Sequence, residues 1–250
     1  MARTTGIFRK RPVNRSETIV VTENGNGRYD EGYNRLKDNL IYYSNDGKHR
    51  VIQIESSIAG EGKTTLACNL AVSLAKNAKK VVIVDLDFRK PRTHRAFKIS
   101  KENGIGDFLS GDLSVSEIVK HTEYGVDIIT GGKAIYNSSL VLTSGKMSDL
   151  ITALRQVYDF VLLDCPPVLL ISDYINIARY SDGIIFVVAA GYTKKSAVIE
   201  AHELIKKTDS PVIGAVMTFT ESASGYYGYY RYKYGYGKSY TYGESQDNQK

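Results

Sequence analysis

The sequence has few cysteines, with only Cys68 and Cys165 among its 250 residues. Two cysteines are too few for the disulfide framework of a small secreted scaffold, and their low number favours a reducing compartment. Each falls inside an expected helix or strand, where a free cysteine usually packs as a small hydrophobic residue. We therefore expect both to be buried core residues.

Long apolar runs are also absent. A membrane-spanning helix needs about 20 predominantly apolar residues in succession, and no run in this sequence approaches that length. The N-terminus likewise lacks the apolar stretch of a signal peptide. The sequence therefore predicts a cytoplasmic protein, for which any role at a membrane requires a partner.

A dense basic stripe, which nucleic-acid-binding proteins usually carry, is missing from the middle of the chain. The net charge is only +6, so we expect no nucleic-acid partner. We expect residues 1–28 to form a flexible arm that is either simply solvated or weakly attracted to an anionic membrane, by at most about 1 kcal/mol per charge. Its basic residues precede the first acidic residue of the chain: Arg3, Arg9, Lys10, Arg11 and Arg15.

Aliphatic side chains are missing from the C-terminal segment, because no Val, Ile, Leu, Met or Phe follows Phe219. Without apolar periodicity, and with glycines that raise the cost of ordering, residues 221–250 are expected to form a mobile tail. The tail carries nine phenol hydroxyls that could accept phosphate, at Tyr226, Tyr227, Tyr229, Tyr230, Tyr232, Tyr234, Tyr236, Tyr240 and Tyr242.

Residues 29–220 alternate between apolar strands and amphipathic helices. This alternation predicts an α/β domain with a doubly wound, mainly parallel sheet, which binds ligands at the carboxyl ends of its strands. The expected strands are 51–54, 81–84, 126–129, 160–163, 184–188 and 212–217. The expected helices are 31–43, 64–76, 115–120, 148–158 and 194–207.

The first strand runs directly into a glycine loop and then a helix, which is the setting of a P-loop. The glycines allow backbone N–H groups to turn toward an anion, and the helix N-terminus adds partial positive charge. We expect Lys63 to reach the β- and γ-phosphates of a nucleotide and the Thr64 hydroxyl to coordinate Mg²⁺. The loop reads Gly60, Glu61, Gly62, Lys63, Thr64 and Thr65.

Two further strands end in carboxylates. Asp164 follows an apolar strand in the manner of a Walker B acid, which orders the metal. Asp85 and Asp87 close another strand, and residues two apart on a strand point the same way, so both can address one site. One of the pair can hold metal through water while the other accepts a proton from an attacking hydroxyl. Alternatively, these acids only cap the turns that follow.

The P-loop, the Asp85-Leu86-Asp87 box, the strand ending at Asp164 and the tyrosine-rich tail, in this order, resemble the bacterial tyrosine kinases. These are P-loop autokinases tied to capsule and exopolysaccharide synthesis. The resemblance implies ATP and Mg²⁺ as ligands and transfer of phosphate to the tail tyrosines, often between subunits of a ring. It assigns Lys63 to catalysis, and Asp85 and Asp87 to the second acidic box, one of them the base. Thr64, Asp87 and Asp164 would hold the metal.

The same resemblance implies partners. In length the chain looks like the cytoplasmic half of a split kinase, which a membrane protein of the polysaccharide co-polymerase type activates and recruits to the inner face of the membrane. A cognate phosphotyrosine phosphatase is also implied. The family's ring contact is a Glu-x-x-Arg-x-x-Arg helix, and here Glu31 is followed by Asn34 and Lys37, with Arg35 one place away. Because an arginine pairs bidentately and these residues do not, ring assembly stays open.

Two other functions are compatible with the P-loop. A partition- or Min-type ATPase that positions cargo would need a C-terminal amphipathic helix or a basic patch, and the tail has no aliphatic residues to form such a helix. A non-enzymatic scaffold would use ATP only to stabilise a ring, and three converging acids have no purpose there. In the bacterial tyrosine kinases an asparagine near the adenine base of the nucleotide often lies where this sequence has Thr218, and a proline is common in the P-loop where it has Ala59.

Overall fold

The computed structural model describes residues 19–21, 29–47, 49–111 and 113–220. The chain divides after Thr218 into two units, and the elements below belong to the first. Most of the expected arm and the whole of the expected tail lie outside the described residues.

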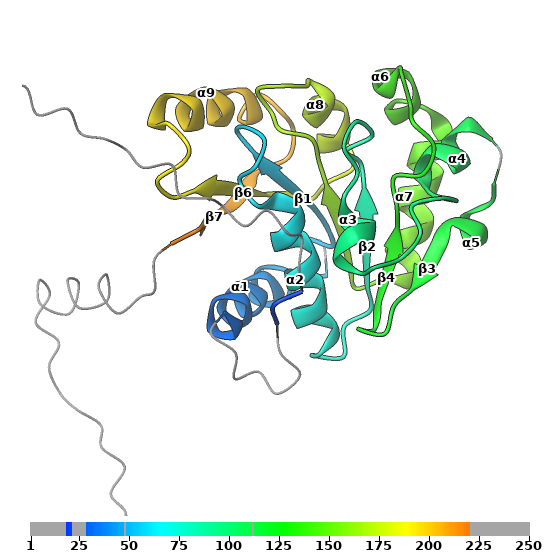
Figure 1. The fold of residues 1–250 in the computed structure, drawn as a ribbon, viewed down its shortest axis with the longest axis horizontal. Helices are drawn as coiled ribbons and strands as arrows, with labels where there is room; N and C mark the ends of the chain where they lie inside the picture. Colours follow the sequence, from blue (N-terminus) through cyan, green and yellow to red (C-terminus); the bar gives the residue numbers. More distant parts are fainter. Residues whose placement is uncertain (1–18, 22–28, 48, 112, 221–250) are drawn as a thin grey trace, which may run out of the picture. The chain divides into compact units, whose positions relative to one another are not determined.

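The described residues build a seven-stranded sheet with the strand order β3-β4-β2-β5-β1-β6-β7 (Figure 1). All neighbouring strands are parallel except β3 and β4, which confirms the expected mainly parallel sheet. The strands are β1 (Val51–Ser56), β2 (Val81–Asp85), β3 (Val119–His121), β4 (Val126–Ile129), β5 (Phe160–Asp164), β6 (Gly183–Ala189) and β7 (Val212–Thr218).

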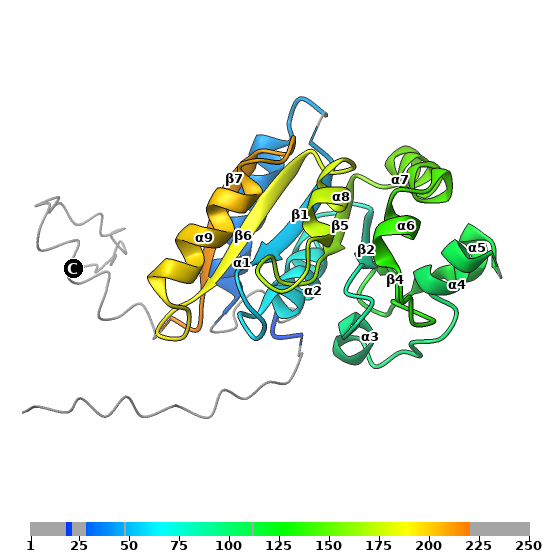
Figure 2. The ribbon, with the colours of Figure 1, turned by 90° about the horizontal axis from the view of Figure 1, so that it is seen from above.

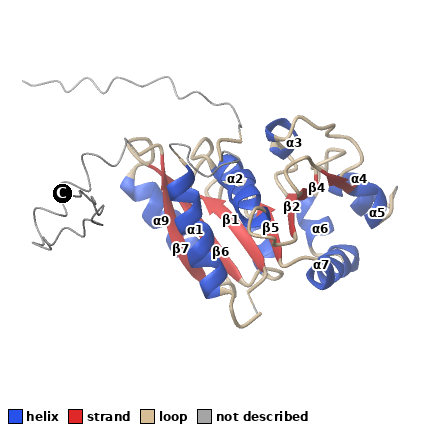
Figure 3. Cartoon of the chain, turned by 90° about the horizontal axis from the view of Figure 1, so that it is seen from below, coloured by secondary structure: helices blue, strands red, loops and turns tan. Residues whose placement is uncertain are grey.

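Helices cover both faces of the sheet (Figures 2 and 3). They are α1 (Asp30–Tyr43), α2 (Lys63–Ala75), α3 (Thr93–Ala96), α4 (Ile105–Ser110), α5 (Val115–Ile118), α6 (Ser138–Leu142), α7 (Gly145–Val157), α8 (Asp173–Ala178) and α9 (Lys195–Ile205). Alternate residues of the central strands serve the two faces, so that Ile83 packs with α2 while Val84 packs with α7. The central strands are therefore buried at every position and mostly apolar, because both faces are covered.

Two segments differ from the sequence-based expectation. A helix was expected over 115–120, but α5 ends at Ile118 and the chain continues as β3. The antiparallel pairing of β3 with β4 satisfies backbone groups that an open sheet edge would leave unpaired. The second segment lies in the expected arm, where the Val20 and Val21 amides donate to Asn69 Oδ1 at 2.6 and 3.2 Å. Val21 is buried in the core on the α2 face.

A close backbone contact joins α4 to the loop after β4. A Cβ atom on Gly106 would lie 2.0 Å from the carbonyl oxygen of Lys133, and one on Gly104 would lie 2.2 Å from that of Thr130. Only glycine fits at these two positions, since the neighbouring atoms are backbone and cannot turn away.

We therefore expect Gly106→Ala to lower the free energy of unfolding by about 2–4 kcal/mol, as overpacking against fixed atoms does. Gly32→Ala is the matched control. It lies in the interior of α1 with nothing within 4 Å of a new Cβ, so it should stabilise the protein by about 0.5–1 kcal/mol. Urea unfolding of the three proteins measures both effects, and equal stability of the two variants would contradict the packing argument.

Candidate functional site

The P-loop connects the central strand β1 to α2. Gly60 and Gly62 have φ angles of +87° and +89°, a left-handed conformation that side chains disfavour. Gly62 is the N-cap of α2 and offers no side chain, so no side chain caps the first turn of the helix. The unsatisfied N–H groups of that turn and the adjacent Lys63, which is 8% exposed, form a site for an anion. Thr64 and Thr65 lie in the same turn.

Glu61 ties the P-loop to the ends of β6 and β7. Its buried carboxylate accepts hydrogen bonds from the Ile58 amide at 2.6 Å and from the Thr193 hydroxyl. Its carbonyl oxygen accepts a bond from the Thr218 hydroxyl at 2.7 Å. Within the sequence, Glu61 was expected among the nucleotide-binding residues. In the structure its side chain instead bonds to Ile58 within the loop and to Thr193 after β6, and so stabilises the conformation of the loop.

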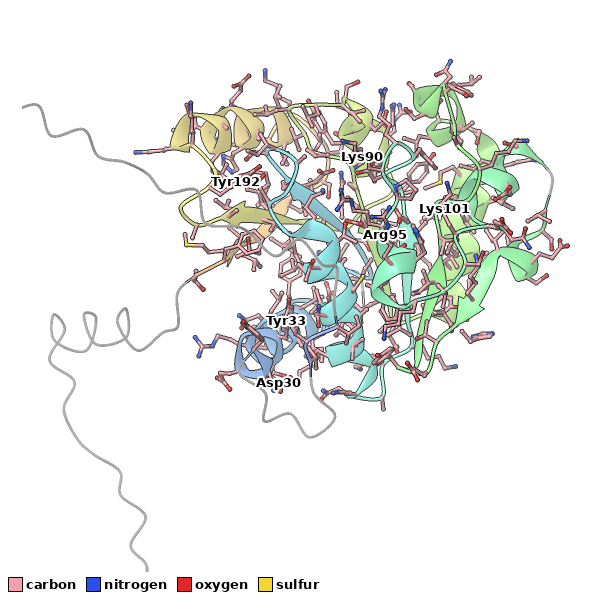
Figure 4. The ribbon with its side chains drawn as sticks, in the orientation of Figure 1. Asp30, Tyr33, Lys90, Arg95, Lys101 and Tyr192 are labelled. Carbon is pink, nitrogen blue, oxygen red and sulfur yellow. The ribbon has the colours of Figure 1, made fainter. Side chains whose placement is uncertain are left out.

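Tyr192, which the sequence did not single out, lies against the P-loop. Its hydroxyl donates to the Ala59 carbonyl oxygen at 3.2 Å, and a Cβ atom on Gly60 would meet this hydroxyl at 3.3 Å. Figure 4 shows Tyr192 in the connection between β6 and α9. No sequence signal indicated this contact, because it depends on the parallel neighbours β1 and β6.

Asp164 ends β5 beside the P-loop, as expected. The Thr64 hydroxyl donates to Asp164 Oδ2 at 2.7 Å, across 100 residues of sequence. The second oxygen, Oδ1, is buried and has no hydrogen-bond partner among the described residues. Burial raises the pKa of Asp164 to about 7, against the opposing effect of Lys63. A buried, unpartnered carboxylate oxygen beside a threonine hydroxyl suits a cation.

Asp85 is fully buried at the end of β2, opposite Asp164 in the strand register. Its Oδ2 accepts three hydrogen bonds, from the Arg92 amide at 2.9 Å, the Thr93 amide at 3.1 Å and the Thr93 hydroxyl at 2.8 Å. Burial raises the pKa of Asp85 to about 6 in spite of these bonds. Asp85 therefore holds the start of α3 against the end of the sheet.

Asp87 lies beyond the strand, because β2 ends at Asp85. This corrects the expectation that both acids project from one strand and so point the same way. Asp87 is partly exposed, and its Oδ1 accepts a bond from the Lys90 amide at 3.0 Å. Its negative charge raises the pKa of both Asp85 and Asp164, although less than burial does. The three carboxylates are thus close, but only that of Asp87 is open to solvent.

Glu55 is a further buried acid that the sequence analysis missed. It accepts a bond from Gln53 Nε2 at 2.7 Å, while its Oε2 has no partner among the described residues. Burial raises the pKa of Glu55 to about 8, and burial together with Glu55 raises the pKa of the Cys165 thiol. The available signal was an acidic residue within an otherwise apolar strand that leads into the P-loop.

The raised pKa of Glu55 predicts a pH dependence of stability. Between its ordinary pKa of 4.5 and about 8, the folded state holds a proton that the unfolded state has released. Stability therefore falls as the pH rises through this window. Glu55→Gln keeps a neutral side chain, so we expect it to be more stable than wild type at pH 9 by a few kcal/mol. The difference should shrink toward pH 5.

Urea unfolding at several pH values measures this difference. The exposed Glu102→Gln is the control and should follow the wild-type curve. Parallel pH profiles for wild type and Glu55→Gln would show that Glu55 is not the protonated group.

The residues of this edge fit a nucleotide with Mg²⁺. Among the described residues, no group of three or more His, Cys, Asp or Glu side chains could hold a metal ion alone. Magnesium in nucleotide sites usually needs only one or two protein ligands, since phosphates and water supply the rest. The Thr64 hydroxyl and the unused oxygen of Asp164 provide such ligands next to the anion site of α2.

Comparison with known proteins identifies the family of the chain. Residues 49–211 match the AAA domain family. The chain is 33% identical over 202 residues to the tyrosine-protein kinase YwqD of Bacillus subtilis, covering 80% of this chain and 85% of the relative. It is 30% identical to the chimerical protein CapA2B2, with a TM-score of 0.76 over 80% of this chain and 88% of that one. The chain belongs to the bacterial tyrosine kinases.

The septum site-determining protein MinD of Pyrococcus horikoshii, in complex with Mg-ADP, shares the fold of this kinase. It is 25% identical with a TM-score of 0.58, covering 68% of this chain and 70% of that one. Both values are below those of CapA2B2, so the comparisons favour a tyrosine kinase over a Min-type positioning ATPase. They also favour an enzyme over a non-enzymatic scaffold.

The helix α1 contains Glu31, Asn34 and Lys37, the residues compared above with the family's ring-contact motif. The Asn34 amide oxygen accepts a hydrogen bond from the Ser73 hydroxyl of α2 at 3.4 Å, and the buried Lys37 pairs with Asp38 at 3.2 Å. Arg35 pairs with Glu31 at 3.3 Å. In the part of the chain that the structure describes, no helix is long and apolar enough to cross a membrane.

Proposed function

We propose that this kinase transfers the γ-phosphate of ATP to tyrosines of its own C-terminal tail. The active site of one subunit would phosphorylate the tail of another, and the reaction would regulate capsular or exopolysaccharide synthesis and export. The observation that carries the proposal is the Thr64–Asp164 contact of 2.7 Å beside the solvent-open Asp87. In this proposal a metal–phosphate site lies next to an accessible base, in a chain that also contains a run of phenols.

The P-loop residues would bind and orient the nucleotide. The first turn of α2 and Lys63 would hold the phosphates, as the loop 60–65 does in the family pattern. Thr64 and Asp164 would hold Mg²⁺, and the negative charge of the nearby Asp87 would help to hold the cation. When bound, Mg²⁺ neutralises negative charge that develops on the phosphates. Glu61 would keep the loop closed through its bonds to β6 and β7.

Asp87, rather than Asp85, would take the phenol proton. Among the described residues, Asp87 accepts only the Lys90 amide bond, on one oxygen. The second oxygen is available to an incoming hydroxyl. Both oxygens of Asp85 are engaged, with Arg92, Thr93 and the Asp87 amide. Asp85 would therefore act as a positioning residue for the turn that carries Asp87.

The partners follow from the family. Two of the relatives are a putative kinase in the cps region of Klebsiella pneumoniae and CapB of Staphylococcus aureus. By analogy, we infer a membrane activator of the polysaccharide co-polymerase type, recruitment to the inner face of the membrane, a cognate phosphotyrosine phosphatase and no nucleic-acid partner. Self-association would use contacts other than arginines of α1, since Asn34 and Lys37 make contacts within the chain.

The proposal predicts where the phosphate goes. Purified protein is incubated with Mg-ATP, with and without the activator's cytoplasmic segment, and phosphotyrosines are mapped by mass spectrometry. Changing all nine tail tyrosines to Phe should remove more than about 90% of the label, because the remaining phenols all belong to the folded first unit. Tyr42→Phe with Tyr136→Phe is the control, since these tyrosines are 84% and 99% exposed on the folded unit. Label that persists after the tail changes would contradict the tail as acceptor.

A further inference from the structure

The segment between β2 and α4 carries an unbalanced positive charge. From Arg89 to Lys101 there is no acidic residue, which corrects the expectation that the middle of the chain has no dense basic segment. Five of its basic side chains are exposed, and none of the five forms an ion pair with a carboxylate of the described residues. We call these five the basic surface: Arg89, Lys90, Arg95, Lys98 and Lys101. Figure 4 labels Lys90, Arg95 and Lys101.

The basic surface is held rigidly at the catalytic edge. Its first member follows Asp87 by two residues, and α3, which carries Arg95, is fixed by the three bonds from Arg92 and Thr93 to Asp85. Ala96 and Phe97 are buried in the core on the α2 face. The same buried acid that orders the site therefore also anchors the cations next to it.

The charge of Arg89 acts on Asp173, while the like charges of the other four cations repel one another and concentrate anions around them. Nothing in the folding of this unit requires them, because the core contacts of α3 come from Ala96 and Phe97. Arginine and lysine bind phosphate groups strongly, arginine in a bidentate manner. The charge and its place favour a phosphate-bearing ligand that comes close to Asp87.

Phosphorylation makes the charge of the tail negative, and a positively charged surface attracts a negative tail. From Glu221 onward it has four basic and three acidic residues, a net charge of +1. Each phosphotyrosine adds about −1.5 to −2 at pH 7. The unmodified tail is therefore not attracted to the basic surface, whereas a tail with a single phosphate already is.

We propose that the basic surface docks phosphotyrosines of the C-terminal tail, so that the first phosphate speeds the addition of the next ones. This rests on the proposed function. The spacing of the phenols allows it, since six of them fall within 226–234, and each residue spans at most about 3.5 Å of extended chain. With one phosphotyrosine docked, its neighbours stay within reach of Asp87, in the same subunit or in another.

The first test is a time course of phosphates per chain by intact-mass spectrometry. For the wild type we expect multiply phosphorylated chains while unmodified chains still remain. The variant Arg95→Gln with Lys98→Gln and Lys101→Gln should add its first phosphate at the wild-type rate within about twofold. Its later phosphates should be slower by about tenfold, as expected for the loss of a few charge-assisted bonds. The control removes the same charge elsewhere, with Lys80→Gln, Lys195→Gln and Lys207→Gln, and should behave as wild type.

The second test does not depend on kinase activity. A fluorescent peptide of residues 221–250, synthesised with or without phosphotyrosine, is titrated into the full-length protein and its anisotropy is measured. We expect the phosphorylated peptide to bind at least about tenfold more tightly than the unmodified one, and the variant to lose this preference.

Several results would overturn the docking proposal. One is equal binding of both peptides. Another is that the control variant also loses the preference for the phosphorylated peptide or also adds its later phosphates slowly. A third is binding to phosphatidylserine vesicles that needs the basic surface and that the phosphorylated peptide does not displace, which would assign the surface to lipid. If no phosphotyrosine forms under any condition, the proposed function fails, and peptide binding alone then decides for or against docking.

Discussion

Replacing Lys63 by methionine is expected to reduce phosphotyrosine formation by at least about 10²-fold while the protein remains folded. Lys63 is the first residue of α2 and is 8% exposed, next to the anion site and to Asp164. Its ammonium group is the positive charge placed to meet the phosphates, and losing such preorganised stabilisation typically costs about 10²–10³ in rate for a single donor. A full charge in a desolvated site should cost at least as much.

Methionine has a similar length and no charge, so the packing of α2 should persist. Because Lys63 lowers the pKa of Asp164 and of Glu55, its loss should raise both further and leave these acids protonated, not charged and unpaired. Phosphotyrosine mapping measures the activity, and thermal unfolding checks the fold. The exposed Lys80→Met is the control. Activity of Lys63→Met above about a tenth of wild type would contradict the role of Lys63.

The second large effect separates the two acids of the Asp-x-Asp box. Asp87→Asn should lower the rate of phosphotyrosine formation by about 10²–10⁴, the usual contribution of a general base. Its stability should change little, because Asp87 is partly exposed and its Oδ1 bond to the Lys90 amide is one that asparagine can also accept.

Asp85→Asn should instead destabilise the protein, by about 1–3 kcal/mol, because an amide nitrogen would replace one of two oxygens that accept bonds from backbone amides. Its activity should fall mainly through displacement of α3 and the turn at Asp87. Urea unfolding together with single-turnover phosphorylation distinguishes the two variants. An inactive Asp85→Asn of wild-type stability, beside an active Asp87→Asn, would reverse the assignment.

One bond of Glu61 joins the P-loop to the last residue of β7. Its carbonyl accepts the Thr218 hydroxyl, and Thr218 is the last residue of the first unit. The end of β7 is therefore bonded to the P-loop. Thr218, at the position where the family often has an asparagine near the adenine base, thus makes a contact within the protein, to the Glu61 carbonyl oxygen.

The sequence by itself determined the class of fold, the P-loop and its order relative to the acidic strands. These depend on local patterns: apolar runs at strand length, glycines before Lys63, and acids directly after apolar strands. Such patterns persist without knowledge of which strands are neighbours, and the parallel arrangement then brings their carboxyl ends together. The absence of aliphatic residues after Phe219 is likewise a local property of the sequence.

Only the tertiary structure decided what each side chain does at that edge. The sequence left Asp85 and Asp87 equivalent, but β2 ends between them, so one is buried with its oxygens bonded and the other reaches solvent. The burial of Glu55 and the contacts of Glu61, Thr218 and Tyr192 depend on strands that pair across more than a hundred residues. Burial and long-range pairing set both the hydrogen bonds and the pKa values, and neither can be found from the spacing of residues along the chain.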